Sequence, residues 1–309
     1  MGVLALDLGG TKLALAIFDS QGNVQQKRVS LLGKRIGAEV GALIREEVCP
    51  FLRAADIRGI GICVPGISHT ATGRVWAPNI PGWEDYPLRE EMASVCGDLP
   101  VMIDSDRACC IIGEAWLGAA RGCRNAIFVT VGTGIGAGIM ADSRILRGAH
   151  DIAGAVGWLA LQRPYDSNYV SCGCFEYYAS GEGIAKAVRE CLPAVRKSLT
   201  AHDVFAAYAL GDPGAERVLR QCVEFWGMAA ANLVSLFNPE KIIFGGGVFG
   251  PAAQFLDEIY AEACKWAQPI SIHQVKLEVS QLGGDAGLSG AARLALDAIH
   301  QNCRVDEHG

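Results

Sequence analysis

Apolar residues along the chain follow two alternating patterns. Short apolar runs bounded by turn residues predict buried strands, and longer segments with apolar residues every third or fourth position predict helices. The expected strands are Val3–Leu6, Leu13–Phe18, Arg58–Val64, Pro100–Ile103, Ala126–Thr130, Ala137–Met140, Lys241–Phe244 and Val275–Val279. The expected helices are Lys34–Leu52, Ser105–Leu117, Gly181–Leu192, Ala201–Leu210, Pro213–Phe237, Phe255–Gln268 and Leu288–Ala298. This mixture predicts an α/β fold.

Two stretches share one order of strand, glycine-rich turn and strand. They cover residues 3–18 and 126–140, and a repeat at this distance indicates a duplicated domain. We expect a first domain of residues 1–116 plus 291–309 and a second of residues 117–290. No segment rich in proline or serine separates them, so we expect the domains to share a cleft and to be joined by the helix near Ser105–Gly118.

Composition narrows the possible partners and location. The 309 residues carry a formal charge of -6 without a basic cluster, so nucleic acid is not an expected partner. No apolar run reaches the roughly 18 residues of a membrane span, and Met1–Leu8 lacks the charged start of a secretion signal. The 12 cysteines are scattered through the chain, many in apolar runs where reduced thiols act as small core residues. We expect a cytoplasmic protein with no membrane partner.

Glycine is concentrated in three turns that follow strands. The turns contain Gly9, Gly10, Thr11 and Lys12; Gly132, Thr133 and Gly134; and Gly245, Gly246 and Gly247. Backbone N–H groups approach phosphates closely where side chains are absent, so these turns predict a nucleotide site. A plain tight turn explains one such segment but not three. The spacing matches neither the Walker loop nor the dinucleotide fingerprint.

Two aspartates at strand ends are candidates for the chemistry. Asp7 is placed to hold a water of Mg²⁺, which prefers oxygen ligands and keeps its hydration. Asp106 starts a helix, whose N-terminus favours an ionised carboxylate, and phosphoryl transfer to an alcohol needs such a base. From the residues alone, a helix-capping role is the stronger alternative for Asp106. Asp104 is a rival base, and its alternative is a solvated turn charge.

The ordered motifs resemble those of ROK sugar kinases, the family of repressors, open reading frames and kinases. The matching segments are Asp7–Lys12, Gly61–Gly66, Pro78-Asn79 with Trp83, Ser105–Glu114, Gly132–Gly136 and Asn238–Val248, and the likeness runs from residue 3 to about 295. The resemblance implies two actin-like domains flanking a cleft, ATP with Mg²⁺ as cofactors, and Asp106 as the base. It implies that Gly9–Lys12 and Gly132–Gly134 line the ATP phosphates and that Gly245–Val248 lies near the adenosine. The sugar or polyol substrate is expected to contact Gly66, Asn79, Ser105, Asp106, Trp158 and Glu176. A homodimer is expected.

The chain departs from the family's pattern at the acceptor. Ser105 stands where the family usually has asparagine, and Ala155 and Trp158 stand where it has a sugar-binding glutamate and a histidine. Loss of the glutamate and the histidine removes oriented hydrogen bonds to sugar hydroxyls. The indole of Trp158 instead offers a face that packs against the apolar face of a ring. Glu176 matches the family's second sugar-contacting glutamate, and its alternative is an exposed acid at a helix start. We expect a derivatised or less hydroxylated acceptor in place of glucose, mannose or their N-acetyl forms.

The family's structural zinc site is incomplete. That site uses the missing histidine and three cysteines, of which Cys172-Gly173-Cys174 retains two. Because structural zinc takes four ligands, we expect no zinc site and interpret the segment as a turn with two reduced thiols.

Three other functions are alternatives to a sugar kinase. A sugar-responsive repressor is disfavoured because the first phosphate turn begins at residue 7, which leaves no room before it for a helix-turn-helix. A non-catalytic sensor is expected to lose Asp7, Asp106 or the turn glycines, and all are present. Another actin-like ATPase, such as a chaperone or filament protein, is disfavoured by the matches at Gly61–Gly66 and Pro78-Asn79.

Overall fold

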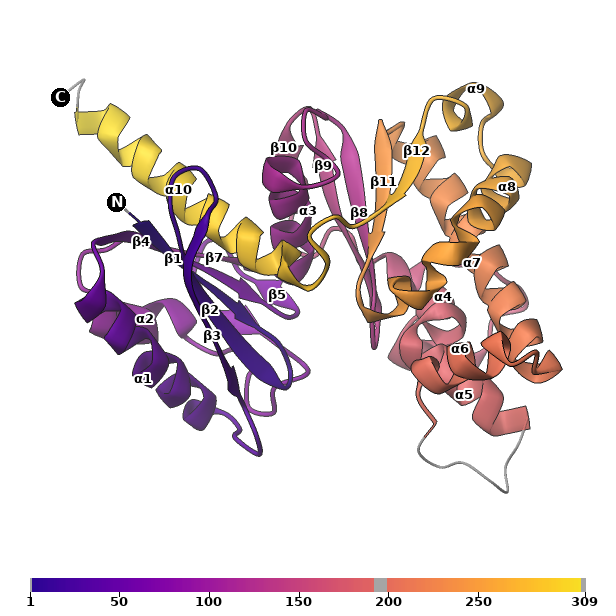
Figure 1. Ribbon diagram of the computed structural model, residues 1–309, viewed down its shortest axis with the longest axis horizontal. Helices are drawn as coiled ribbons and strands as arrows, with labels where there is room; N and C mark the ends of the chain where they lie inside the picture. Colours follow the sequence, from indigo (N-terminus) through magenta and orange to yellow (C-terminus); the bar gives the residue numbers. More distant parts are fainter. Residues whose placement is uncertain (1, 192–198, 307–309) are drawn as a thin grey trace. The chain divides into compact units, whose positions relative to one another are not determined.

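The computed structural model describes residues 2–191 and 199–306 and divides into two compact units (Figure 1). Unit 1 comprises Met1–Arg121, Arg147–Ala153 and Asp285–Gly309, and unit 2 comprises Gly122–Leu146 and Gly154–Gly284. This division differs from the one expected from sequence in that residues 117–121, 147–153 and 285–290 group with unit 1.

Unit 1 is built on a five-stranded sheet in the order β3-β2-β1-β4-β7. Its strands are β1 Gly2–Leu8, β2 Lys12–Phe18, β3 Val24–Leu31, β4 Ile57–Val64 and β7 Val101–Ser105, and a separate two-stranded sheet contains β5 Ile67–Ser68 and β6 Val75–Trp76. Its helices are α1 Ala38–Ala54, α2 Leu88–Cys96, α3 Asp106–Leu117 and α10 Ala286–Asp306. The strands β1, β2 and β3 pair antiparallel, whereas β1, β4 and β7 pair parallel. The carboxyl ends of β1, β4 and β7 therefore meet at one edge.

Alternate residues of β1 pack on opposite faces of this sheet. Leu4 and Leu6 belong to a core with residues of α1 and α2, and Val3 and Ala5 belong to one with residues of α10. Figure 1 shows α1 and α2 on one side of the sheet and α10 on the other. A central strand buried on both faces reads as a continuous apolar run, which explains why the sequence identified β1.

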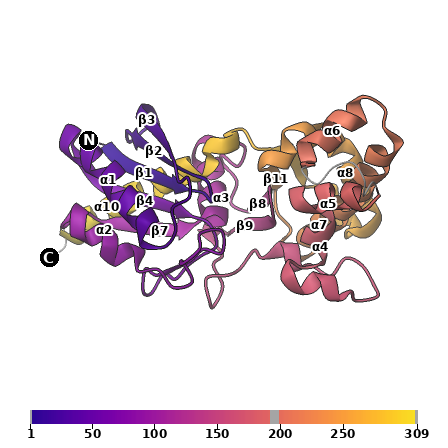
Figure 2. The ribbon, with the colours of Figure 1, turned by 90° about the horizontal axis from the view of Figure 1, so that it is seen from below.

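Unit 2 repeats the topology with the order β10-β9-β8-β11-β12. Its strands are β8 Ala126–Val131, β9 Ile135–Ala141, β10 Arg144–Ile145, β11 Lys241–Gly245 and β12 Lys276–Val279. Its helices are α4 Cys174–Ala179, α5 Gly181–Cys191, α6 Ala201–Ala209, α7 Pro213–Phe237, α8 Leu256–Trp266 and α9 Pro269–Ile272, and 3-10 turns occur at Val156–Trp158, Ser167–Ser171, Gly247–Phe249 and Pro251–Phe255. A fifth 3-10 turn, Gly283–Asp285, precedes α10. Helices α4 to α8 gather on one side of β8 and β11 (Figures 1 and 2). Both units have the same strand order, as the repeated strand–turn–strand pattern predicted.

Four described elements of unit 1 were not among the expected ones: β3, α2 and the two-residue strands β5 and β6. The strand β3 is largely polar and exposed, and it forms at the sheet edge by pairing with β2. Helix α2 buries only Leu88, Met92 and Cys96 along one face, which is too little apolar periodicity to mark a helix in the sequence. The expected end of a helix at Leu192 lies outside the described residues.

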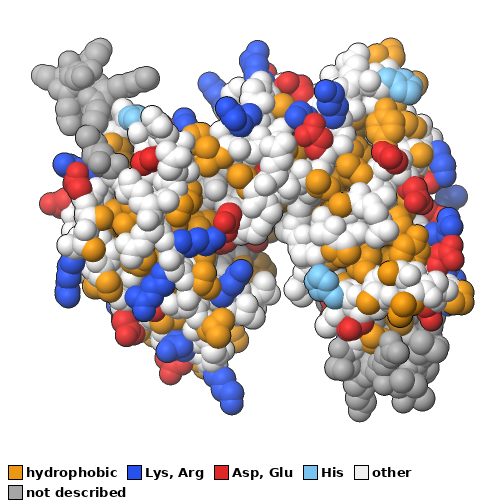
Figure 3. All heavy atoms as spheres, viewed as in Figure 1, with side chains coloured by type: hydrophobic (Ala, Val, Ile, Leu, Met, Phe, Trp, Pro, Cys, Tyr) orange, Lys and Arg blue, Asp and Glu red, His pale blue; other side chains and the backbone are white. Residues whose placement is uncertain are grey.

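Surface and helix properties agree with the composition. On the described part of the face in Figure 3, Lys and Arg side chains are interspersed with Asp and Glu. Across residues 2–191 and 199–306, every helix is too short or too polar to span a lipid bilayer.

Candidate active site

Asp106 lies at the junction of β7 and α3. Ser105 is the capping residue, because its Oγ accepts a hydrogen bond from the Ala108 N–H at 3.3 Å. Asp106 is the first residue of the helix, and its Oδ1 accepts a hydrogen bond from the Arg107 N–H at 2.8 Å. The capping role that was the alternative for Asp106 therefore belongs to Ser105.

The Asp106 carboxyl group has the electrostatics of a base. Burial raises its pKa from the ordinary 3.8 to about 6, against the charge and N–H group of Arg107, which lower it, and the Asp7 charge adds to the increase. Such a group is ionised at neutral pH and yet accepts a proton more readily than an ordinary aspartate.

Asp7 lies at the end of β1, in register with Cys63 on β4, which in turn is in register with Asp104 on β7. Burial raises the pKa of Asp7, and the Cys63 hydrogen bond and the Lys12 charge lower it. A Cβ atom on Gly287, in the first turn of α10, would lie 3.3 Å from Asp7 Oδ2. The helix N-terminus therefore approaches the carboxylate closely.

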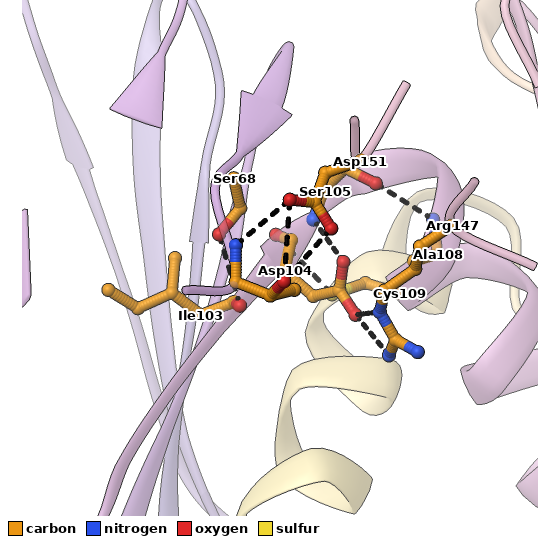
Figure 4. Close-up of polar contacts among 9 residues, drawn as sticks. Ser68, Ile103, Asp104, Ser105, Ala108, Cys109, Arg147 and Asp151 are labelled. Atoms are coloured by element: carbon orange, nitrogen blue, oxygen red, sulfur yellow. Dashed lines mark hydrogen bonds and ion pairs between the residues drawn. The ribbon is translucent and has the colours of Figure 1, made fainter. Parts of the chain in front are cut away.

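Asp104, the rival base, is engaged by an arginine. Its Oδ2 accepts hydrogen bonds from Nε and Nη2 of Arg147 at 3.0 and 2.6 Å (Figure 4). Its Oδ1 accepts a hydrogen bond from the Ser105 N–H at 2.8 Å. The Asp104 side chain is only 7% exposed. A buried carboxylate held in this way is poorly suited to take a proton from a substrate, so the geometry favours Asp106.

The β1–β2 turn carries the first predicted phosphate contacts. The Gly9 N–H donates to the Lys12 carbonyl at 2.9 Å, which leaves Gly10 and Thr11 exposed at the tip. A Cβ atom on Gly10 would lie 3.3 Å from the Asn79 Cβ. Residues expected to contact the nucleotide and the acceptor are thus neighbours within unit 1.

Gly66, another expected acceptor contact, is tied to the same junction as Asp106. It has φ +92° after β4, and its carbonyl accepts a hydrogen bond from Arg107 Nη2 at 3.0 Å. Arg107 therefore joins Gly66 to the first turn of α3.

In unit 2, the turn of Gly132, Thr133 and Gly134 connects β8 and β9. Glu176 of α4 packs on this turn, and its Oε2 accepts a hydrogen bond from the Ile135 N–H at 2.6 Å. Burial raises the pKa of Glu176, whereas the Ile135 N–H lowers it. Glu176 is therefore a partly buried carboxylate that supports the turn, in contrast to the exposed acid of the alternative interpretation.

Trp158 ends a 3-10 turn in unit 2 and is 57% exposed. Its backbone lies against Gly173: a Cβ atom there would be 2.5 Å from the Trp158 Cα. A Cβ atom on Gly157, beside Trp158, would be 3.0 Å from the Glu176 Cβ. The two residues expected to contact the acceptor from unit 2 thus lie close together, and Trp158 presents its indole to solvent.

A pocket of 440 Å³ opens within unit 2. It is lined by Gly132, Thr133, Gly181, Glu182, Ala185, Arg189, Leu199, Thr200, Ala201, His202, Phe205, Gly247, Val248 and Pro251. Of the glycine triplet, Gly247 faces open space, whereas a Cβ atom on Gly245 would lie 2.3 Å from the Phe128 ring. Gly246 has φ +87°, which redirects the chain between them.

Several residues of these sites were not predicted from sequence. In the sequence alone, the missed residues look like ordinary surface charges: Arg147, which contacts Asp104, and Glu182, Arg189 and His202 in the pocket. Arg107, which donates to the Gly66 carbonyl, was also missed, although its position next to Asp106 was a signal.

Comparison with known proteins identifies the family. The family model described as ROK family matches residues 3–298. This chain belongs to the ROK family. It is 32% identical over 314 residues to the glucokinase of Halalkalibacterium halodurans, with 94% of each protein covered. The ROK hexokinase of Thermus thermophilus superposes with a TM-score of 0.82 at 30% identity, covering 97% of this chain and 100% of that one. A ROK family glucokinase from Streptomyces griseus, in complex with glucose and AMPPNP, superposes with a TM-score of 0.80 at 28% identity, covering 96% and 100%. The predicted family and fold of two actin-like domains are confirmed.

The cysteine segment of this ROK protein gives a first prediction. Among the side chains that the structure describes, no three of His, Cys, Asp or Glu are grouped to hold a metal ion. We expect the purified protein to carry no stoichiometric zinc, because a structural site needs four ligands and Trp158 supplies none. Elemental analysis measures this. About one zinc per chain, lost in Cys172→Ser but retained in the control Cys49→Ser, would contradict the prediction.

Proposed function

We propose that this ROK protein is an ATP-dependent kinase that phosphorylates a hydroxyl group of a sugar or sugar derivative. The observation that carries the proposal is the contrast between two carboxyl groups at the end of β7. Asp104 is buried and paired with Arg147, whereas Asp106 is half-buried and desolvation raises its pKa to about 6. A base of this kind suits a reaction in which an alcohol loses its proton to become a nucleophile.

In the proposed reaction, Asp106 orients the acceptor hydroxyl and accepts its proton as the bond from oxygen to phosphorus forms. Because phosphoryl transfer needs little covalent help, the remaining groups align the reactants and neutralise charge. We assign the N–H groups of the turns at Gly9–Lys12 and Gly132–Gly134, together with the Lys12 ammonium, to the ATP phosphates.

Asp7 fits the proposed role of holding Mg²⁺ through water. It offers a hard carboxylate oxygen beside a phosphate turn, and a divalent cation there would offset the burial that raises its pKa. When bound, the ion supplies charge neutralisation at the phosphates.

We assign the adenosine of ATP to the pocket of unit 2, and Gly247 provides the test. Gly247→Val adds a side chain that points into open space, so it should fill the pocket and raise the KM for ATP roughly tenfold or more, while the melting temperature stays within a few degrees. Gly245→Ala is the matched control. Its new methyl group meets the Phe128 ring, so its main effect should be a lower melting temperature and not a higher KM for ATP. Steady-state kinetics with varied ATP measure the effect, and an unchanged KM in Gly247→Val would place the adenosine elsewhere.

We propose that the acceptor contacts Gly66, Asn79, Ser105, Asp106, Trp158 and Glu176. Glu176 uses Oε2 for the Ile135 N–H, and we propose that Oε1 accepts from an acceptor hydroxyl. A panel of sugars and polyols screened for ADP release tests the function.

The altered acceptor residues favour one second candidate, a sugar-responsive sensor without catalysis. Ala155 and Trp158 remove two polar groups that the family uses to hold sugars. A sugar that raises the melting temperature but never stimulates ADP release would support the sensor and reject the kinase.

We further propose that the enzyme is a cytoplasmic homodimer. The ten cysteines whose placement is described are free thiols, which suits a reducing compartment. Light scattering of the purified protein tests the dimer.

A further inference from the structure

The segment Arg147–Ala153, here called the strap, connects β10 to the 3-10 turn that ends at Trp158. It belongs to unit 1. Its two ends are joined, because the Ala153 N–H donates to the Arg147 carbonyl at 3.0 Å. Gly148 and Asp151 have positive φ angles of 77° and 58°, which fold the strap into a compact loop.

The strap is attached to unit 1 at two points. Arg147 reaches Asp104 with two nitrogen atoms, as Figure 4 shows. Asp151 accepts hydrogen bonds from the N–H and Oγ1 of Thr70 at 3.1 and 3.0 Å. Two attachments hold the strap in one position, so the Arg147 guanidinium contacts Asp104 with little further loss of conformational entropy.

The ion pair fixes the backbone that carries Asp106. Asp104 uses one oxygen for Arg147 and the other for the Ser105 N–H, the residue directly before Asp106. The Asp104 carbonyl also accepts a weak hydrogen bond from Cys109 Sγ, one turn into α3, at 3.9 Å. Rotation of the Asp104 side chain would therefore release the strand end and shift the start of α3.

The pair is too buried to act as a surface ion pair. The side chains of Asp104 and Arg147 are 7% and 34% exposed. Removing Arg147 would leave the Asp104 charge uncompensated in a poorly hydrated place, which is strongly destabilising for the local structure. Lysine keeps the charge but makes a point contact in place of the two-atom contact of arginine.

We propose that Arg147 is a positioning residue for phosphoryl transfer, which orients Asp106 through Asp104 and the Ser105 amide. The proposal rests on the assignment of Asp106 as the base. The strap leads directly into Gly154, Ala155 and Trp158, so the residue that orients the base and the altered acceptor residues lie on one continuous segment.

Arg147→Met tests the proposal, with Arg144→Met on β10 as the control for loss of an exposed arginine. Arg147→Met should lower kcat roughly tenfold or more, since misplacing a reacting group by a fraction of an ångström has effects of this order. The KM values for ATP and acceptor should change less than threefold. The acid limb of the pH–kcat profile should move to higher pH, because the unpaired Asp104 charge disfavours ionised Asp106. Arg147→Lys should recover part of kcat, and Arg144→Met should match the natural protein.

Amide hydrogen exchange separates this proposal from the proposed function. Exchange at Ser105 and Arg107 should speed up in Arg147→Met but not in Arg144→Met, whether or not an acceptor is known. Faster exchange in a protein that phosphorylates no sugar would reject the function and keep the positioning contact. Unchanged exchange, or an unchanged kcat and pH profile in folded Arg147→Met, overturns the proposal. If Arg147→Met does not fold, the double variant Asp104→Asn with Arg147→Met removes both charges. A kcat equal to that of the natural protein in this double variant would also overturn it.

Discussion

Asp106→Asn is expected to lower kcat by roughly 10²-fold or more, because the variant cannot accept the proton of the acceptor hydroxyl. Asparagine keeps the size of the side chain and the oxygen that accepts from the Arg107 N–H. ATP binding and the fold should therefore persist. Single-turnover kinetics with the best acceptor of the panel measure the loss.

The same substitution should stabilise the protein at neutral pH. The pKa of Asp106 is about 6 in the folded state and an ordinary 3.8 when the chain is unfolded. The folded state thus binds more protons between these values, so this group's contribution to stability falls as the pH rises from about 4 to about 6. A neutral side chain avoids that loss, which corresponds to about 1–3 kcal/mol at pH 7. Urea denaturation at pH 4 and pH 7 measures it: the gain should be present at pH 7 and nearly absent at pH 4.

Asp104→Asn is the matched control two residues away. It should lower stability, because Arg147 loses its buried partner, and it should lower kcat less than Asp106→Asn does. The pH dependence of kcat adds a further check, since turnover of the natural enzyme should fall as the pH drops below about 6. A mild Asp106→Asn beside a crippling Asp104→Asn would show that the base was assigned to the wrong aspartate.

Glucose, mannose and N-acetylmannosamine are expected to be poor acceptors. By the resemblance, Ala155 and Trp158 stand in place of two polar groups that hold sugar hydroxyls, and each unpaired buried hydroxyl costs about 1–3 kcal/mol. Two such losses correspond to roughly 30-fold or more in kcat/KM, at about 1.4 kcal/mol per factor of ten. Trp158 is 57% exposed, so its indole face is available to an acceptor with an apolar side.

Restoring the two groups should reverse this preference. Ala155→Glu with Trp158→His should raise kcat/KM on hexoses and lower it on the natural acceptor. Each single variant should do less, because the two groups hold neighbouring hydroxyls. Trp158→Ala is the control: it should weaken the natural acceptor without improving glucose. If the natural enzyme phosphorylates glucose with a kcat/KM equal to that for its best acceptor, the inference drawn from Ala155 and Trp158 is wrong, although the kinase assignment stands.

The sequence alone determined the features that depend on local pattern. Buried strands such as β1 read as apolar runs, and turns that approach phosphates need glycine whatever surrounds them, so the repeated fold and the turn at Gly132–Gly134 could be predicted. Asp106 was a candidate because it follows an apolar strand at a helix start, and only the resemblance to a family favoured it as the base over a capping role. The motif order then indicated the ROK family, which the comparisons confirmed.

Only the tertiary structure decided how the charges are distributed among partners. Arg147 and Asp104 are 43 residues apart, and Glu176 and Ile135 are 41 apart. No local pattern joins such pairs, because their contact depends on how strands and loops pack after the chain has folded. The burial that raises the pKa of Asp106 has the same origin: desolvation is a property of the surrounding atoms, most of which are distant in sequence. The sequence therefore indicated which residues have reactive side chains, and packing decided that Asp104 is paired with Arg147 and that the pKa of Asp106 is raised.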